Sequence, residues 1–156
     1  MIRIEIPGQD HIELKHIVLD FNGTMATDGV LIPGVQESLN QLSSLLEVHL
    51  LTADTFGTVR EACLHIKGNV TVLSQGAGSP DKKSFVSRLG EKSVVAVGNG
   101  MNDRLMLRTA ALGILVMGSE GASCQALMSA DIVVGNILDA LNLLINPKRI
   151  TATLRS

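Results

Sequence analysis

An aspartate that could act as a nucleophile stands at the end of an apolar run, in the segment His-Ile-Val-Leu-Asp-Phe-Asn-Gly-Thr over residues 16–24. A carboxylate at the carboxyl end of a parallel strand lies where open α/β sheets bind their ligands. The turn that follows contains Gly23, and its backbone N–H groups can face an anion. Asp20 is therefore the candidate nucleophile, although an Asp-x-Asn-Gly turn is also ordinary turn chemistry at a strand end.

Three later segments add groups that phosphoryl transfer could use. Thr52 ends an apolar run, and its hydroxyl can donate to a phosphate oxygen. Lys82 or Lys83 begins an expected helix, where a cation opposes the helix dipole unless it meets an anion. The segment Gly-Asn-Gly-Met-Asn-Asp over 98–103 has glycines that allow close backbone approach, and its last residue, Asp103, can bind a hard cation. Four such features in chain order favour one common site over four separate turns.

The elements that must position these groups alternate between strand and helix. Residues 2–6 and 11–14 predict a hairpin, and residues 24–33 an irregular flap. Further strands are expected at 16–20, 48–52, 70–73, 94–97, 112–116 and 132–134. Helices are expected at about 34–46, 55–67 with Asp54 as its cap, 79–89 opened by Ser79 and Pro80, 102–110, 120–129 and from 137. This rhythm predicts a doubly wound, Rossmann-like α/β/α sandwich with a parallel sheet, as a single domain over 1–156.

Composition excludes several classes of function. With 46% hydrophobic residues, 18% charged residues and a formal net charge of −2, neither sign forms a long block, which argues against a nucleic-acid or membrane-binding face. The longest apolar run, 110–117, is too short to span a membrane, and the N-terminus does not resemble a signal peptide. We therefore expect a soluble, cytoplasmic protein. Cys63 and Cys124 lie far apart and the four histidines are scattered, so neither a disulfide nor a zinc site is predicted.

The four motifs, in this order, resemble those of the haloacid dehalogenase-like phosphotransferases. Within that superfamily the resemblance is closest to the phosphorylation domain of P-type ATPases and their soluble stand-alone relatives. Residues 52–58 resemble the Thr-Gly-Asp segment of that domain, and residues 98–103 resemble its Gly-Asp-Gly-x-Asn-Asp hinge. The resemblance covers about residues 16–135. It implies a capless, Mg²⁺-dependent phosphohydrolase that forms an aspartyl phosphate on Asp20.

The resemblance also implies a set of Mg²⁺ ligands. These are Asp20, the backbone carbonyl of Asn22 and Asp103, with Asn99 contributing a neutral oxygen directly or through water. Asn102 would orient Asp103 or a bound water. Because Asn99 replaces an acid of the family motif, metal binding is expected to be weaker than in relatives that keep that acid.

A second set of residues is implied for the phosphoryl group. Thr52 and one lysine would neutralise its oxygens, and Gly23 and Ala53 support the two loops from within their motifs. The resemblance favours Lys82 over Lys83, because the apolar residues Phe85, Val86 and Leu89 follow Lys82 at +3, +4 and +7, as they do after the lysine of the family motif. The expected substrate is a small phosphorylated molecule, and by analogy neighbouring subunits of a homo-oligomer could cover the site.

Departures from the family pattern decide between the remaining functions. Asn22 stands where phosphatases place a second aspartate, which predicts slow turnover and keeps open a non-pumping regulatory module that binds phosphate and Mg²⁺. Thr52 follows Asp20 by only 32 residues, and the gap from Thr52 to Lys82 is equally short, which leaves no room for the nucleotide-binding domain of a pump. Because no membrane helix is expected either, the chain is not a pump by itself. A plain nucleotide-binding Rossmann domain is disfavoured because no Gly-x-Gly-x-x-Gly opens a helix.

Overall fold

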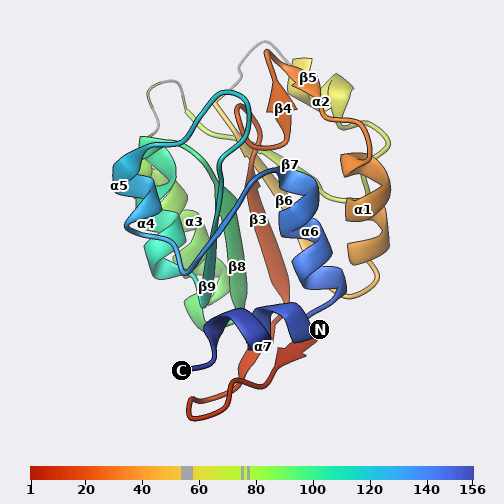
Figure 1. Cartoon of the computed structure of the whole chain (residues 1–156). Coiled ribbons are helices and arrows are strands. Elements are labelled where there is room, and N and C mark those ends of the chain that lie inside the picture. The colour runs from red at the N-terminus through yellow and green to blue at the C-terminus, as the bar shows by residue number, and fades with distance from the viewer. Residues whose placement is uncertain (54–57, 75, 77) are drawn as a thin grey trace.

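A computed structural model of the chain describes residues 1–53, 58–74, 76 and 78–156 (Figure 1). Its centre is a six-stranded parallel sheet with the strand order β10-β9-β8-β3-β6-β7. The strands are β3 (His16–Asp20), β6 (Glu47–Thr52), β7 (Asn69–Val72), β8 (Val94–Gly98), β9 (Leu112–Val116) and β10 (Ile132–Val134). All six expected strands are confirmed to within one residue at either end, as is the doubly wound fold class.

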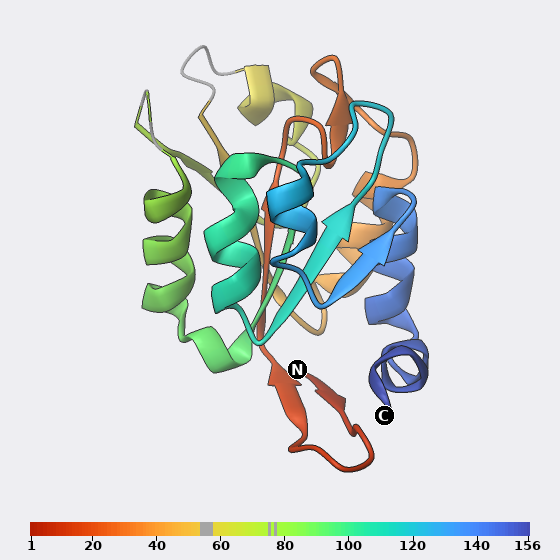
Figure 2. The same cartoon turned by 60° about the vertical axis from the view of Figure 1, so that its left-hand side comes forward.

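Helices cover both faces of the sheet and make it the middle of three layers (Figures 1 and 2). One face carries α1 (Val35–Leu42), α2 (Thr58–Ala62) and α6 (Ile137–Ile145), and the other carries α3 (Ser79–Leu89), α4 (Arg104–Thr109) and α5 (Cys124–Leu127). The core is aliphatic on both sides. The four inner strands, β9, β8, β3 and β6, are almost entirely buried and largely apolar, as strands of a parallel sheet covered on both faces usually are, whereas the outer strands β7 and β10 are partly exposed. No cap domain is inserted in the described part of the chain.

The strand register brings the predicted site residues to one edge of the sheet. β3 is central and pairs with both β6 and β8, so that Leu19 lies opposite Leu50 on one side and Val97 on the other. Asp20 is the last residue of β3 and Thr52 the last residue of β6. The polar segments that follow these strands therefore emerge next to one another.

Residues 24–33 form a small hairpin where the sequence indicated only an irregular flap. Its strands are β4 (Ala26–Thr27) and β5 (Val30–Leu31), which pair antiparallel. Asp28 and Gly29 connect them with φ angles of 51° and 76°. A two-residue turn with both central residues at positive φ is the favoured hairpin connection, and Asp-Gly is one of its preferred sequences. The dipeptide was the signal that the sequence analysis missed.

A second hairpin stands at the opposite end of the sheet. Its strands, β1 (Ile2–Ile4) and β2 (Ile12–Leu14), confirm the expected opening of the chain. It contacts α7 (Lys148–Leu154), which the sequence analysis had merged with α6 into one C-terminal helix. Pro147 separates the two, because its missing N–H and its ring exclude it from a helix interior.

Several other helices differ from expectation at their ends. α1 ends at Leu42, where the hydroxyls of Ser43 and Ser44 bond back to carbonyls three residues earlier and compete with helix continuation. α5 is a single turn within the expected 120–129, and a 3-10 turn, η2 (Met101–Asp103), precedes α4. The N-cap of α3 is Gly78, so Ser79 lies inside the helix. The cap predicted at Asp54 lies outside the described residues. Among the described helices, none has the length and apolar character needed to cross a membrane.

Candidate active site

The ammonium group of Lys82 lies between two buried carboxylates. Its Nζ atom donates to Oδ1 of Asp20 and to Oδ1 of Asp103, at 2.6 Å in each case. Asp20 comes from the end of β3, Asp103 from η2 after β8, and Lys82 from the first turn of α3. The exposed fractions are 8% for Asp20, 2% for Lys82 and 0% for Asp103. When both carboxylates are ionised, this buried cluster carries one net negative charge.

The cluster shifts the ionisation of its members. Burial raises the pKa of Asp20 to about 7, and the negative charge of Asp103 acts in the same direction, whereas Lys82 partly offsets both. Burial alone would lower the pKa of Lys82, but the two carboxylates outweigh it and the pKa of the lysine is raised. Lys82 is therefore a fixed positive charge at the carboxyl edge of the sheet.

The backbone of the 98–103 segment holds the carboxylate of Asp103. Its Oδ2 atom accepts hydrogen bonds from the N–H groups of Asn99 and Gly100, at 3.0 and 2.9 Å. A Cβ atom at Gly98 would lie 2.6 Å from the Asp103 carboxyl carbon, so only glycine permits this close packing. The sequence motif thus forms a cradle that orients one carboxylate oxygen and leaves the other for Lys82.

Thr24 is a buried site residue that the sequence analysis did not single out. Its hydroxyl lies 3.4 Å from Oδ2 of Asp20 and 3.2 Å from Oδ1 of Asn99. The chain turns back after β3 because the carbonyl of Phe21 accepts from the N–H groups of Thr24, Met25 and Ala26. In the sequence, Thr24 could have been recognised as a hydroxyl residue that follows Asp20 by four positions, within the turn that reverses the chain after β3.

Asn99 and Gly23 lie against each other beside this turn. The Nδ2 atom of Asn99 donates to the carbonyl of Gly121 at 3.0 Å, so both ends of the amide have protein partners. Gly23 has a φ angle of 78°, and a Cβ atom there would come within 2.5 Å of Asn99 Nδ2. The role of Asn99 as a direct or water-mediated metal ligand stays a prediction.

The other predicted site residues differ in their exposure. Thr52 is buried at the end of β6, and Ala53, directly after it, is exposed. Asn22 is exposed on the turn after β3, and Asn102 is exposed on η2. Lys83, the alternative to Lys82, is also exposed. Their proposed roles toward phosphate and metal stay predictions.

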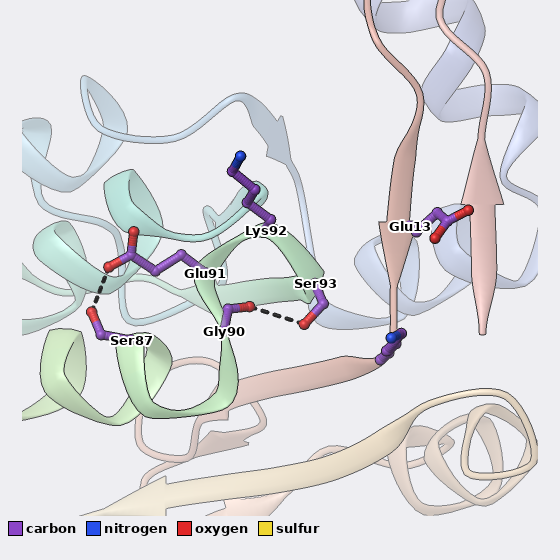
Figure 3. A pocket seen from close by; sticks show the side chains of 7 residues that line it. Glu13, Ser87, Gly90, Glu91, Lys92 and Ser93 are labelled. Atoms are coloured by element: carbon purple, nitrogen blue, oxygen red, sulfur yellow. Dashed lines mark hydrogen bonds between the residues drawn. The ribbon is translucent and has the colours of Figure 1, made fainter.

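A surface hollow of about 550 Å³ lies at the opposite end of the sheet (Figure 3). It is formed by residues before β3, by the end of α3 and by the 3-10 turn η1 (Glu91–Ser93): Glu13, Lys15, Ser87, Gly90, Glu91, Lys92 and Ser93. Figure 3 shows the side chain of Ser87 bonded to Glu91 and that of Ser93 bonded to the carbonyl of Gly90. None of the predicted site residues is among the described residues that line it.

Comparison with known proteins identifies two sets of relatives. The uncharacterized protein MJ0073 of Methanocaldococcus jannaschii is 53% identical over 64 residues, which are 41% of this chain and 69% of that protein. The chain belongs to the family of this archaeal protein. Phospholipid-transporting ATPase 10 of Arabidopsis thaliana is 38% identical over 134 residues, covering 81% of this chain but only 11% of the ATPase. No family model matches the sequence.

The structure identifies the fold independently. The 3-deoxy-D-manno-octulosonate 8-phosphate phosphatase of Moraxella catarrhalis, solved with a magnesium ion, a phosphate ion and a KDO molecule, superposes with a TM-score of 0.71. The alignment covers 89% of this chain and 90% of the phosphatase, at 14% identity. The protein therefore has the haloacid dehalogenase-like fold, as the motifs indicated, and it also resembles P-type ATPases in sequence.

Proposed function

We propose that this protein is a Mg²⁺-dependent phosphohydrolase that forms an aspartyl phosphate on Asp20. The observation that carries the proposal is the buried cluster of Asp20, Lys82 and Asp103 at the carboxyl edge of the sheet. Structural ion pairs are usually exposed, whereas burying a cluster with an excess negative charge lowers the stability of the fold. Such a cluster is therefore expected where a bound cation or substrate interacts with the charge. The likeness in fold to a phosphatase that was solved with a magnesium ion and a phosphate ion supports the assignment.

The donor set fits Mg²⁺. Hard divalent cations prefer oxygen ligands, and the cluster offers two carboxylates with one uncompensated negative charge. Asp20 and Asp103 would hold the ion, together with the carbonyl of Asn22 and an oxygen of Asn99 directly or through water. When bound, the ion would neutralise charge that develops on the phosphoryl oxygens.

The chain's own residues then divide the reaction into two steps. In the first, a carboxylate oxygen of Asp20 forms a bond to phosphorus while the bond to the leaving oxygen breaks. In the second, water attacks the same phosphorus, inorganic phosphate leaves and the carboxylate of Asp20 is restored. In both steps the ammonium of Lys82 balances the negative charge of the phosphoryl group, and the hydroxyl of Thr52 donates a hydrogen bond to one of its oxygens. Such stabilisation is where most catalysis of phosphoryl transfer arises.

The substrate class is proposed from the likeness in fold to a phosphatase, and this end of the sheet is open. Asn22 and Asn102 are exposed beside the cluster, and no cap domain covers it in the described part of the chain. We assign a small phosphorylated molecule as substrate, because the substrate of the phosphatase from M. catarrhalis belongs to this class.

The test is hydrolysis of an aryl phosphate with and without Mg²⁺. Wild-type protein should release phosphate only with Mg²⁺, and Asp20→Asn, which keeps the shape but removes the anionic nucleophile, should release none. Asp103→Asn should raise the Mg²⁺ concentration needed for half-maximal rate. Asp10→Asn, an exposed aspartate in the far hairpin, is the matched control and should behave as wild type. Turnover by Asp20→Asn with a wild-type melting curve would exclude the mechanism.

Asn22 favours a second function, a regulatory module that binds phosphate and Mg²⁺ without useful turnover. A carboxamide can neither protonate a leaving group nor activate water. Equilibrium binding of inorganic phosphate, measured in the same samples, separates the two functions. Saturable, Mg²⁺-dependent binding without hydrolysis of any phosphate ester in a substrate panel would establish the module.

A further inference from the structure

A second cluster of ligating side chains lies at the amino-terminal edge of the sheet. His16 begins β3, Glu47 begins β6, and His49 follows two residues later on the same face of β6. The parallel register places His16 beside Glu47 and Val18 beside His49, so the three side chains converge. His49 is 5% exposed, His16 is partly buried and Glu47 is exposed. The cluster is therefore half open to solvent and held by two neighbouring strands.

The distances within this cluster match those between ligands of one metal ion. Nδ1 of His16 lies 3.3 Å from Nε2 of His49 and 3.3 Å from Oε2 of Glu47. Nε2 of His49 lies 3.8 Å from Oε1 of Glu47. Two ligands at about 2.0–2.1 Å from a tetrahedral Zn²⁺ are themselves about 3.3–3.4 Å apart. Two of the three distances already match this spacing, and a small rotation of the exposed Glu47 side chain would shorten the third, from His49 to Glu47.

The chemistry of the donors selects a borderline metal ion. Two neutral imidazoles and one carboxylate suit Zn²⁺, whereas Mg²⁺ takes oxygen ligands almost exclusively. We propose that His16, Glu47 and His49 form a Zn²⁺ site that is separate from the Asp20 site, with water as the fourth ligand. His₂Glu with one open position is an established ligand set for Zn²⁺.

Neighbouring groups hold the ligands in this arrangement. Nδ2 of Asn69, on the adjacent strand β7, donates to Oε1 of Glu47 at 3.3 Å. The ring of Phe85 on α3 packs edge-on against His49, with centroids 5.6 Å apart, and limits its rotation. Such outer contacts orient the ligands of metal sites and change affinity when they are removed.

The two sites lie at opposite ends of the same strand. Four residue steps along β3 separate His16 from Asp20, about 13 Å for an extended chain. An ion at this edge would join the starts of β3 and β6, the two strands whose other ends carry Asp20 and Thr52. We assign it a stabilising role, since any ion that binds only the folded chain raises its stability by mass action.

The probe is Co²⁺, added to the full chain in the presence of saturating Mg²⁺ so that the Asp20 site is occupied. Tetrahedral Co²⁺ with nitrogen ligands absorbs strongly in the visible range, and octahedral Co²⁺ with oxygen ligands does not. One equivalent should produce the strong bands, and one equivalent of Zn²⁺ should abolish them. Zn²⁺ should also raise the melting temperature.

Two variants and two controls complete the experiment. Glu47→Gln alters an exposed residue, and His16→Asn a partly buried one, so both should fold; each should weaken Zn²⁺ binding at least ~10-fold, the smaller loss found even for outer-shell groups. His65→Asn, an exposed histidine elsewhere, and Asp103→Asn should keep the Co²⁺ spectrum. Phosphatase activity with Mg²⁺ should be the same in Glu47→Gln as in wild type.

Three results would overturn this Zn²⁺ site. The first is a weak, octahedral Co²⁺ spectrum in the wild type. The second is a strong spectrum that survives both Glu47→Gln and His16→Asn. The third is no Zn²⁺-dependent rise in melting temperature, which would show that the three side chains form a hydrogen-bonded cluster without a metal ion.

Discussion

Lys82 and Asp20 come from segments 62 residues apart, and in the folded chain the ammonium nitrogen of Lys82 lies 2.6 Å from Oδ1 of Asp20. The same nitrogen also bonds to Asp103. Removing the lysine would leave two buried carboxylates facing each other without a cation. Lys82 is therefore needed for stability as well as being the candidate ligand of the phosphoryl group.

Replacing each lysine separately tests both roles. Lys82→Met should lower the free energy of unfolding by about 3 kcal/mol in Mg²⁺-free buffer, since breaking a buried ion pair from one side costs ~3–5 kcal/mol. Lys83→Met changes an exposed side chain and should stay within about 0.5 kcal/mol of wild type. Urea unfolding followed by circular dichroism measures both, and Mg²⁺ should restore part of the loss in Lys82→Met. Equal effects of the two substitutions would contradict the structural role of Lys82.

A matched pair of glycines separates backbone strain from crowding at the site. Gly23 and Gly29 have φ angles of 78° and 76°, but a Cβ atom at Gly23 would meet Asn99 at 2.5 Å, whereas nothing lies within 4 Å at Gly29. Both alanine variants incur the left-handed penalty of about 1–2 kcal/mol. Gly23→Ala should lose more stability than Gly29→Ala and should also lose phosphatase activity. If both variants lose the same stability and keep their activity, the contact with Asn99 does not shape the site.

The two cysteines should differ in reactivity. Burial raises the pKa of Cys63 to about 11, so at pH 8 only on the order of one thiol in 1,000 is the nucleophilic thiolate. Cys124 is exposed. Iodoacetamide at pH 8, followed by peptide mass analysis, should modify Cys124 and leave Cys63 unmodified until denaturant is added. Rapid modification of Cys63 in the native protein would show that the core beneath α2 opens readily.

Local patterns in the sequence predicted most of the fold. Five of the six strands of the central sheet are mostly apolar runs bounded by polar or glycine residues, and only β7, Asn-Val-Thr-Val, is half polar. The local pattern therefore agreed with the tertiary packing at most strands. Two of the errors fall where one or two residues determine the local structure, at Pro147 between α6 and α7 and at the Asp28-Gly29 turn. The end of α1 was less predictable because the side chains of Ser43 and Ser44 bond to main-chain carbonyls and compete with continuation of the helix.

The candidate site was predictable only as a list of residues. Sequence spacing indicated that Asp20, Lys82 and Asp103 gather at one edge, but it gave no reason for one ammonium to bond to both carboxylates. The pair His16 and His49 shows the limit more clearly. Separated by 33 positions, these residues appeared scattered in the sequence, and only the register between β3 and β6 brings their ring nitrogens to 3.3 Å. Contacts across parallel strands have no local signal.

Asn22 carries the prediction that most directly tests the proposed chemistry. In related phosphatases the second aspartate of the motif protonates the leaving group and then activates water, and an amide does neither. Positioned general acid–base catalysis contributes typically ~10²–10⁴-fold. The wild type should therefore turn over slowly and accumulate phosphoenzyme, which acid quenching with a radiolabelled substrate would detect.

The substitution Asn22→Asp restores a titratable group of nearly the same shape on an exposed turn, so the fold should not change. We expect turnover to rise, and to rise more for an alkyl phosphate, whose leaving group needs a proton, than for an aryl phosphate, which leaves unassisted. Met101→Asp, an added carboxylate at an exposed position of η2 to which no role in the site is assigned, is the control for charge alone. Steady-state kinetics on both substrates measures the difference. An equal gain in both variants would assign the effect to tighter Mg²⁺ binding, and no gain with either substrate would favour the binding module over the phosphatase.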